Sequence, residues 1–190
     1  RESQEYPVVV GDIDEESLRR LGPWPWPRQH LTELTKDISA MGASAIVIYL
    51  SLADTDTMSP QRIARLLPPD DAFNNARERL SALPDTDTAL AAAIGAAPVV
   101  LGFVPSNNAT GTDPSLKVPA ASLHNANTGT LLSFPVATNA LQKLQDAASG
   151  YGSFPVIARG TTTVRQLPLF VSINKNVYPS LTAEALRVHA

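Results

Sequence analysis

Short apolar runs bounded by proline or glycine recur along the first half of the chain. They cover residues 6–13, 43–52 and 98–104, and the first of them contains Val8, Val9 and Val10 in succession. A continuous apolar run of this length is typical of a strand that is covered on both faces of a sheet. We therefore expect three strands here, and we expect the first two to form a right-handed parallel crossover unit, because helical patterns lie between them.

Apolar residues spaced by three or four positions predict helices between these runs. The clearest helix is 29–41, whose buried face should carry Leu31, Leu34, Ile38 and Met41. Acidic residues in the first turn and a terminal glycine mark a shorter helix at 17–21. Two further helices are expected at 60–67 and 71–83, and a third is capped by Asp85 and Asp87 and ends near Gly95. A helix at 138–148 should turn Leu141 and Leu144 inward and end at Gly150 as its cap. The last expected helix is capped by Ser180.

The last forty residues change to consecutive strands, expected at 153–158, 164–173 and 177–178, with turn-forming residues at 159–161 and 174–176. Residues 105–130 are polar and rich in Asn, Thr, Gly, Ser and Pro, which is typical of a long functional loop. The pattern as a whole predicts one α/β domain over residues 1–190. Its central sheet should be mixed, partly parallel and flanked by helices, and the C-terminal strands should be antiparallel.

Composition excludes several classes of protein. Of the 190 residues, 44% are hydrophobic, which is enough to bury a core and argues against disorder. The net charge of −3 argues against a nucleic-acid partner, and the absence of cysteine excludes disulfides and cysteine-ligated metals. No run is long enough to cross a bilayer, and the chain opens without a start signal, so we expect a fragment of a longer protein.

Acidic pairs are the first candidates for chemistry. Asp12 and Asp14 follow the first expected strand, at the sheet edge where α/β proteins place ligands or metals. With a bound metal they would suit a small α/β hydrolase or phosphatase, which is our alternative function. The competing interpretation is that Asp caps helices and turns, because every such pair lies beside an expected helix start or loop. The other pairs are Asp54/Asp56, Asp70/Asp71 and Asp85/Asp87.

The remaining residue types give no sign of a catalytic, metal or cofactor site. His30, His124 and His189 lie far apart and none has a partner at the spacing of a metal pair. The chain has neither a nucleophile elbow nor a phosphate-binding glycine loop. We therefore predict no catalytic residues, no metal ligands and no cofactor for this chain.

The segment Pro23-Trp24-Pro25-Trp26-Pro27-Arg28 holds both tryptophans of the chain. In an extended run, alternate residues point to the same side, so the two indoles could line a ligand pocket with Arg28 available for an anion. The structural alternative is a rigid corner that fills the core, with Arg28 paired to Asp12 or Asp14.

Residues 8–18 and 21–28 resemble the opening of the CHASE2 sensor domain, and the Trp-Pro-Trp-Pro-Arg corner is the most specific part of the likeness. The resemblance continues through 42–48 and returns at 164–169 and 177–181. Two positions depart from the family pattern. Tyr49 stands where an aspartate usually follows the second strand, and 159–163 replace an Asp-x-Asp-Gly turn. If either acidic site helps to bind a ligand, this chain binds a different ligand or none.

The resemblance implies a non-enzymatic, extracytoplasmic (periplasmic) sensory domain of a bacterial transmembrane receptor. Such a domain lies between membrane helices outside this sequence, and its cytoplasmic output is a histidine kinase, a nucleotide cyclase or a serine/threonine kinase. We expect a homodimer and an unidentified small-molecule or protein stimulus, with a protein partner docking on residues 105–130 as a further possibility. A ligand should bind at the strand ends near Asp12, Asp14, Trp24, Trp26, Arg28 and Arg165.

Overall fold

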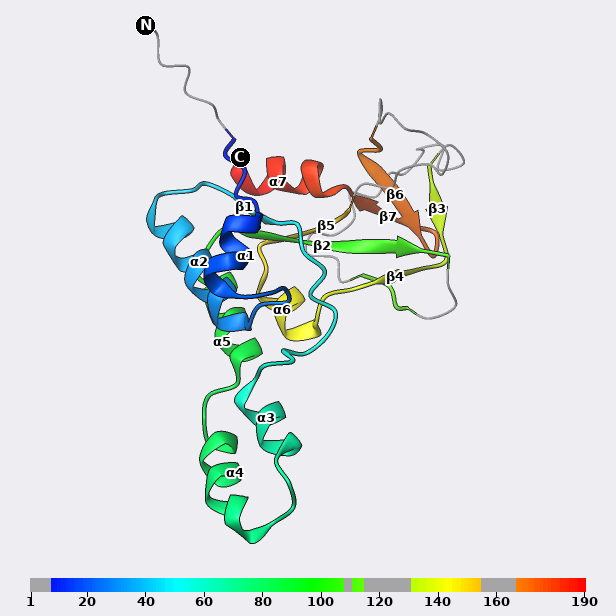
Figure 1. Cartoon of the computed structure of the whole chain (residues 1–190). Coiled ribbons are helices and arrows are strands. Elements are labelled where there is room, and N and C mark those ends of the chain that lie inside the picture. The colour runs from blue at the N-terminus through cyan, green and yellow to red at the C-terminus, as the bar shows by residue number, and fades with distance from the viewer. Residues whose placement is uncertain (1–7, 108–110, 115–130, 155–166) are drawn as a thin grey trace, which may run out of the picture.

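A computed structural model describes residues 8–107, 111–114, 131–154 and 167–190. Its centre is a mixed four-stranded sheet (Figure 1). The strand β2 (Val99–Ser106) lies in the middle, parallel to β1 (Ile46–Ile48) on one side and to β5 (Gly150–Ser153) on the other. The end of β2 pairs with β4 (Val136–Thr138) in antiparallel register, Val104 opposite Thr138.

Helices cover both faces of this sheet (Figure 1). On one face lie α2 (Arg28–Ala40), α5 (Thr86–Gly95) and α6 (Gln142–Ala147), which bury the larger part of the core against β1 and β2. On the other face α7 (Leu181–His189) buries Leu181 against Val100 and Phe154. Because both faces are covered, β2 is apolar along most of its length.

A smaller sheet adjoins the first, with β6 (Phe170–Ile173) between β3 (Ser133–Phe134) and β7 (Asn176–Pro179). The strands β6 and β7 form an antiparallel hairpin. Its two turn residues, Asn174 and Lys175, both have positive φ, 46° and 68°, which matches the twist that a two-residue hairpin turn requires.

Two helical segments project from this body (Figure 1). One is a helical hairpin made of α3 (Pro60–Leu66), the 3-10 turn η1 (Asp71–Phe73) and α4 (Asn74–Ser81). The other is the N-terminal arm, residues 8–21, which ends in α1 (Glu15–Leu21). The helix α1 has no buried residue, so the arm contributes nothing to the core.

The structure confirms the α/β class, the mixed and partly parallel sheet, and the antiparallel strands near the C-terminus. It also confirms three helix caps that the sequence predicted. Asp85 and Ser180 cap α5 and α7 through their side chains, and Gly22 ends α1 at a φ of 92°. That conformation favours glycine because a Cβ would crowd the backbone there.

The expected strand at 6–13 is wrong for the described residues 8–13, which lie outside any helix or strand. Val8, Val9 and Val10 are between 74% and 90% exposed. A strand exists only where neighbouring backbone accepts its hydrogen bonds, and no strand of the described chain pairs with this segment. The predicted crossover between this segment and β1 is therefore absent as well.

The predicted buried face of α2 is also wrong in part. Leu31 is buried, but Leu34 and Met41 are exposed, and Thr32 and Thr35 are buried in their place. Both threonine hydroxyls donate to carbonyls one turn earlier, of Arg28 and Leu31, so their burial leaves no donor unsatisfied. The face of α2 that packs on α5 can therefore be partly polar.

Other differences concern boundaries. Residues 136–138 form β4, where the sequence predicted the start of a helix, and Gly150 opens β5 instead of capping α6. The strand expected at 153–158 ends at Ser153 in the described chain, and the strand expected at 164–173 is described only as 170–173. The predicted turn at 159–161 and most of the loop 105–130 lie outside the described residues. Within the ranges described, no helix combines the length and hydropathy needed to cross a membrane.

The space around each glycine predicts whether it tolerates a side chain, and Gly152 lies where β5 packs closely against the start of α7. A Cβ on Gly152 would lie 2.7 Å from the Ser180 carbonyl oxygen, whereas a Cβ on Gly95 would meet nothing nearer than 3.8 Å. We expect Gly152→Ala to lower the free energy of unfolding by about 1–3 kcal/mol, because backbone must move. Gly95→Ala, the matched control, should be neutral or stabilising, since alanine favours helices. Urea unfolding of both variants measures the difference, and equal midpoints would contradict it.

Candidate functional site

A buried ion pair lies at the start of α2. Arg28 is only 8% exposed, and its side-chain Nε donates a hydrogen bond to Asp87 Oδ1 at 3.2 Å. Its Nη2 also donates to the Asp54 carbonyl at 2.7 Å. One guanidinium therefore joins α2, the loop that follows β1, and the first turn of α5.

A second buried carboxylate, Asp56, completes this charge cluster. Asp56 Oδ2 accepts hydrogen bonds from the backbone N–H of Arg28 at 3.0 Å and from the Thr86 hydroxyl at 2.8 Å. The backbone N–H of Asp56 in turn donates to Asp87 Oδ2 at 3.0 Å. The four residues Arg28, Asp56, Thr86 and Asp87 are called the Arg28 cluster below.

The Arg28 cluster explains how α2 begins without a capping side chain of its own. Its N-cap residue, Pro27, offers no side-chain acceptor to the free N–H groups of the first turn. Asp56 supplies that acceptor from a distant part of the sequence. A carboxylate also suits the positive end of the helix dipole, so the arrangement is favourable in charge as well as in hydrogen bonding.

The tryptophan corner packs directly before α2. Trp26 is buried, and its indole N–H donates to the Gly22 carbonyl at 2.8 Å. Its ring meets those of Trp24 and His30 edge to face, with centroids 5.9 and 6.1 Å apart. Trp24 itself stays largely exposed. The Trp26 indole therefore anchors the turn 22–26, and the Trp24 indole covers that turn.

The structure does not bring all the predicted site residues together. Trp24, Trp26 and Arg28 are neighbours, but Asp12 and Asp14 lie on the exposed N-terminal arm. Asp14 caps α1, accepting from the backbone N–H and the hydroxyl of Ser17, and these hydrogen bonds lower its pKa below the usual value. Arg165 lies outside the described residues.

The expected pairing of Arg28 with Asp12 or Asp14 is wrong, because the guanidinium bonds to Asp87 and the Asp54 carbonyl. The sequence analysis missed the residues that do pair with it. Asp56 and Asp87 appeared only as members of acidic doublets with a capping role. The sequence carries no signal for this pairing, because the burial of Arg28, which requires a carboxylate to face it, is visible only in the folded chain.

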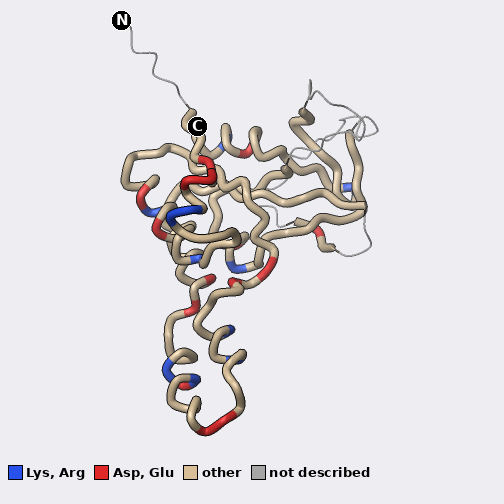
Figure 2. Tube along the Cα trace, viewed as in Figure 1, with Lys and Arg blue, Asp and Glu red and all other residues tan. Residues whose placement is uncertain are grey.

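A pocket of about 220 Å³ opens beside the Arg28 cluster, where the helical hairpin joins the body. Acidic and basic residues lie close together along the chain trace at this junction (Figure 2). The hairpin side of the pocket carries Arg62 and Arg65, and the body side carries Asp85 and Asp87. Neither arginine forms an ion pair within the described part of the chain.

The two acidic residues of this pocket are already engaged. Asp87 belongs to the Arg28 cluster, and Asp85 Oδ2 accepts from Lys143 Nζ at 2.7 Å. The hydrogen bond from Lys143 is the main reason why the pKa of Asp85 lies below its usual value. The two arginines are therefore the groups that remain available to a ligand, and they favour an anion.

A wider and more open hollow of about 520 Å³ lies beside the end of β4, between the loop that follows β1 and the start of α6. Most of its lining comes from 111–112 and 137–142, and the Asn139 amide donates to the carbonyl and hydroxyl of Thr112 there. None of the described residues that line it is charged, and their polar groups offer hydrogen bonds.

Nothing in the described residues favours a metal-dependent hydrolase. They contain no group of three or more His, Cys, Asp or Glu side chains that could hold a metal ion. Asp12 and Asp14, which the alternative function requires, line neither pocket.

Comparison with known proteins gives one match. The family model for the CHASE2 domain matches residues 1–190, the whole length of the chain. No curated protein and no solved structure matches the chain significantly.

The burial of the Arg28 cluster predicts that Arg28 is essential for stability. Arg28→Ala would leave Asp87 without its ion-pair partner in a buried site, so we expect a loss of about 3–5 kcal/mol. Arg20→Ala is the matched control, because Arg20 pairs with Glu16 in solvent and such pairs contribute about 0.2–1 kcal/mol. Chemical unfolding at neutral pH compares the two variants. A loss below 1 kcal/mol for Arg28→Ala would contradict a structural role.

Proposed function

The chain belongs to the CHASE2 family of extracellular sensory domains, and we propose that it is the periplasmic input domain of a bacterial transmembrane receptor. The observation that carries this proposal is the match of the family model over all 190 residues. CHASE2 domains sense and do not catalyse, so the signalling activity belongs to another part of the receptor.

In the proposed receptor, membrane helices outside this sequence connect the domain to a cytoplasmic histidine kinase, nucleotide cyclase or serine/threonine kinase. The receptor is proposed to work as a homodimer. Signalling then requires two states of the domain, to which the stimulus binds with different affinity.

We place the proposed ligand site in the pocket at the base of the helical hairpin. Of the residues expected from the sequence, Arg28 is the one linked to this pocket, since its partner Asp87 forms part of the lining. Arg62 and Arg65, which form no ion pair with another described residue, support a small anionic ligand such as a carboxylate. The volume of about 220 Å³ suits a ligand smaller than most drug-like molecules.

This position offers a physical route for a signal. The pocket is lined by Gln61, Arg62 and Arg65 from the hairpin, and by Thr55, Ser59, Asp85 and Asp87 from the segments that join the hairpin to the body. A ligand that contacts both sides restrains the hairpin relative to the body. Because Asp87 also holds Arg28, the restraint reaches the start of α2 and the tryptophan corner beside it.

The proposed periplasmic location predicts protease access from one side of the membrane. In spheroplasts that express the full-length receptor, added protease should cleave within this domain while a cytoplasmic marker protein stays intact. Immunoblotting against the domain and against the marker measures this. A domain that is digested only after lysis would contradict the location.

The proposed anion site predicts a loss of binding when its arginines are removed. Thermal unfolding with succinate and with acetate as probes should show stabilisation of the wild-type chain, about 2.7 kcal/mol at a concentration one hundred times Kd. Arg62→Ala/Arg65→Ala should abolish that stabilisation.

The control for this experiment is Arg20→Ala/Arg79→Ala, which changes the net charge equally at exposed positions that line neither pocket. It should keep the stabilisation, whereas an equal loss in both double variants would show an effect of charge alone. A wild-type chain that neither probe stabilises would contradict the carboxylate class.

A further inference from the structure

The N-terminal arm exposes an unusual run of side chains. Val8, Val9 and Val10 are consecutive, β-branched and at least 74% exposed. They precede Gly11, around which a Cβ would meet no atom within 4 Å, so the segment lies open to solvent. Residues of this kind favour strands, and three of them side by side form an apolar surface that water solvates poorly.

The central sheet has a free edge at β1. Among the described strands, β1 pairs only with β2. The Ile46 N–H donates to the Pro98 carbonyl at 2.9 Å, so Ile46 and Ile48 direct their backbone groups toward β2. Backbone direction alternates along a strand, and the N–H and C=O of Val47 therefore point outward, away from β2.

Side chains at this edge are exposed as well. Val47 is 43% exposed and Tyr49 is 62% exposed, on the face of the sheet opposite Ile46 and Ile48. The Tyr49 ring packs against Phe154, with centroids 4.7 Å apart, which places this pair on the side of α7. The edge thus offers one unused backbone donor, one unused acceptor and an apolar patch beside them.

The two features fit each other. We propose that residues 8–10 of one copy of this chain add as a parallel strand to the β1 edge of a second copy, and that the exchange is reciprocal. The Val47 N–H then donates to the Val8 carbonyl and the Val10 N–H donates to the Val47 carbonyl. Val9 lies beside Val47 on the α7 face, while Val8 and Val10 extend the face that carries Ile46 and Ile48.

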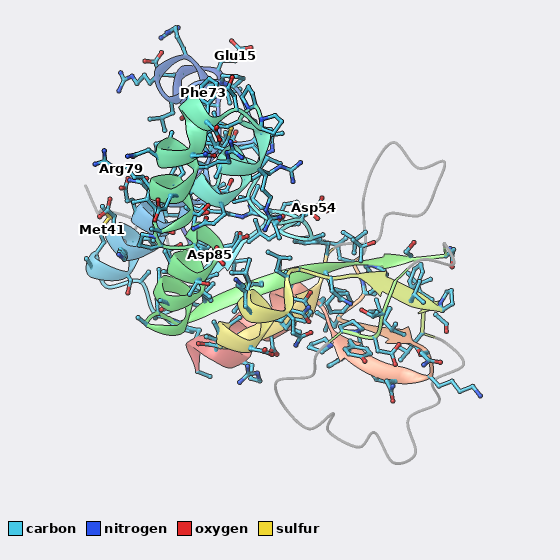
Figure 3. The ribbon with its side chains drawn as sticks, turned by 90° about the horizontal axis from the view of Figure 1, so that it is seen from below. Glu15, Met41, Asp54, Phe73, Arg79 and Asp85 are labelled. Atoms are coloured by element: carbon cyan, nitrogen blue, oxygen red, sulfur yellow. The ribbon has the colours of Figure 1, made fainter. Side chains whose placement is uncertain are left out.

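The anchoring of the arm favours a second copy over the chain's own edge. Buried Trp26, bonded to the Gly22 carbonyl, fixes the turn from which the arm leaves the body. Figure 3 shows α1, marked by Glu15, well away from the strands of the sheet. Residues 8–10 stay exposed and pair with no described strand, so the arm leaves the β1 edge of its own sheet uncovered and remains available to a neighbour, as in a domain-swapped dimer.

The absence of cysteine makes a direct test possible. In Val9→Cys/Val47→Cys, mild oxidation should link two chains, giving a species of twice 20.2 kDa on non-reducing gels. In the control Val9→Cys/Leu66→Cys, the second cysteine lies on the exposed outer part of α3, and no specific dimer should form. A disulfide within one chain, recognised by its peptide mass in a monomer, would overturn the exchange.

Proline at two neighbouring positions tests the edge without cysteines. Val47→Pro removes an N–H that does not face β2, so the chain should stay folded by circular dichroism but sediment as a monomer. Ile46→Pro removes the bond to Pro98 and should destabilise the fold. The wild-type chain should sediment as a dimer. A monomeric wild type, or a Val47→Pro variant that remains dimeric, would overturn the proposal while leaving the sensory function, which rests on the family, untouched.

Discussion

The structure depends on one buried guanidinium. Burying the Arg28 charge is costly unless it is paired and hydrogen-bonded, and two other segments of the chain supply partners for its side chain and its backbone N–H. Asp87 comes from α5, Asp56 and the Asp54 carbonyl come from the loop after β1, and Arg28 itself opens α2. These segments must adopt their positions together, because each supplies part of the same hydrogen-bonded cluster. The buried charge therefore specifies how α2, α5 and the loop after β1 pack, more narrowly than apolar contacts alone would.

The opposite face of the sheet uses the same kind of attachment. Glu184 of α7 is buried, accepts from the backbone N–H of Tyr151 in β5, and pairs with Arg187. Gly150 leaves the room for that carboxylate, since a Cβ there would lie 2.8 Å from Glu184 Cγ. Buried carboxylates thus hold the helices on both faces: Asp56 and Asp87 join α2, α5 and the loop after β1, and Glu184 joins α7 to β5.

Local signals in the sequence identified most helices and the strands β1 and β2, because caps, terminal glycines and apolar spacing act over a few residues. Asp85, Ser180 and Gly22 are examples. Long-range pairing was not accessible in the same way. The partner of Arg28 lies 59 residues away, and nothing in the spacing of Asp56 or Asp87 distinguishes a buried carboxylate from a helix cap. The β-branched pattern of residues 8–10 likewise indicates that they can form a strand, but it does not indicate which sheet edge that strand pairs with.

The two ends of the helical hairpin are held together at its base. Asp56, which precedes the hairpin, accepts a hydrogen bond from Thr86, which follows it, and the ion pair of Arg28 and Asp87 lies beside them on the body side. The chain therefore leaves the body and re-enters it at the same place. The hairpin therefore meets the physical condition for a tolerated insertion. Its length can change while the sheet and the core keep their structure, since insertions whose ends lie close together leave the parent fold intact.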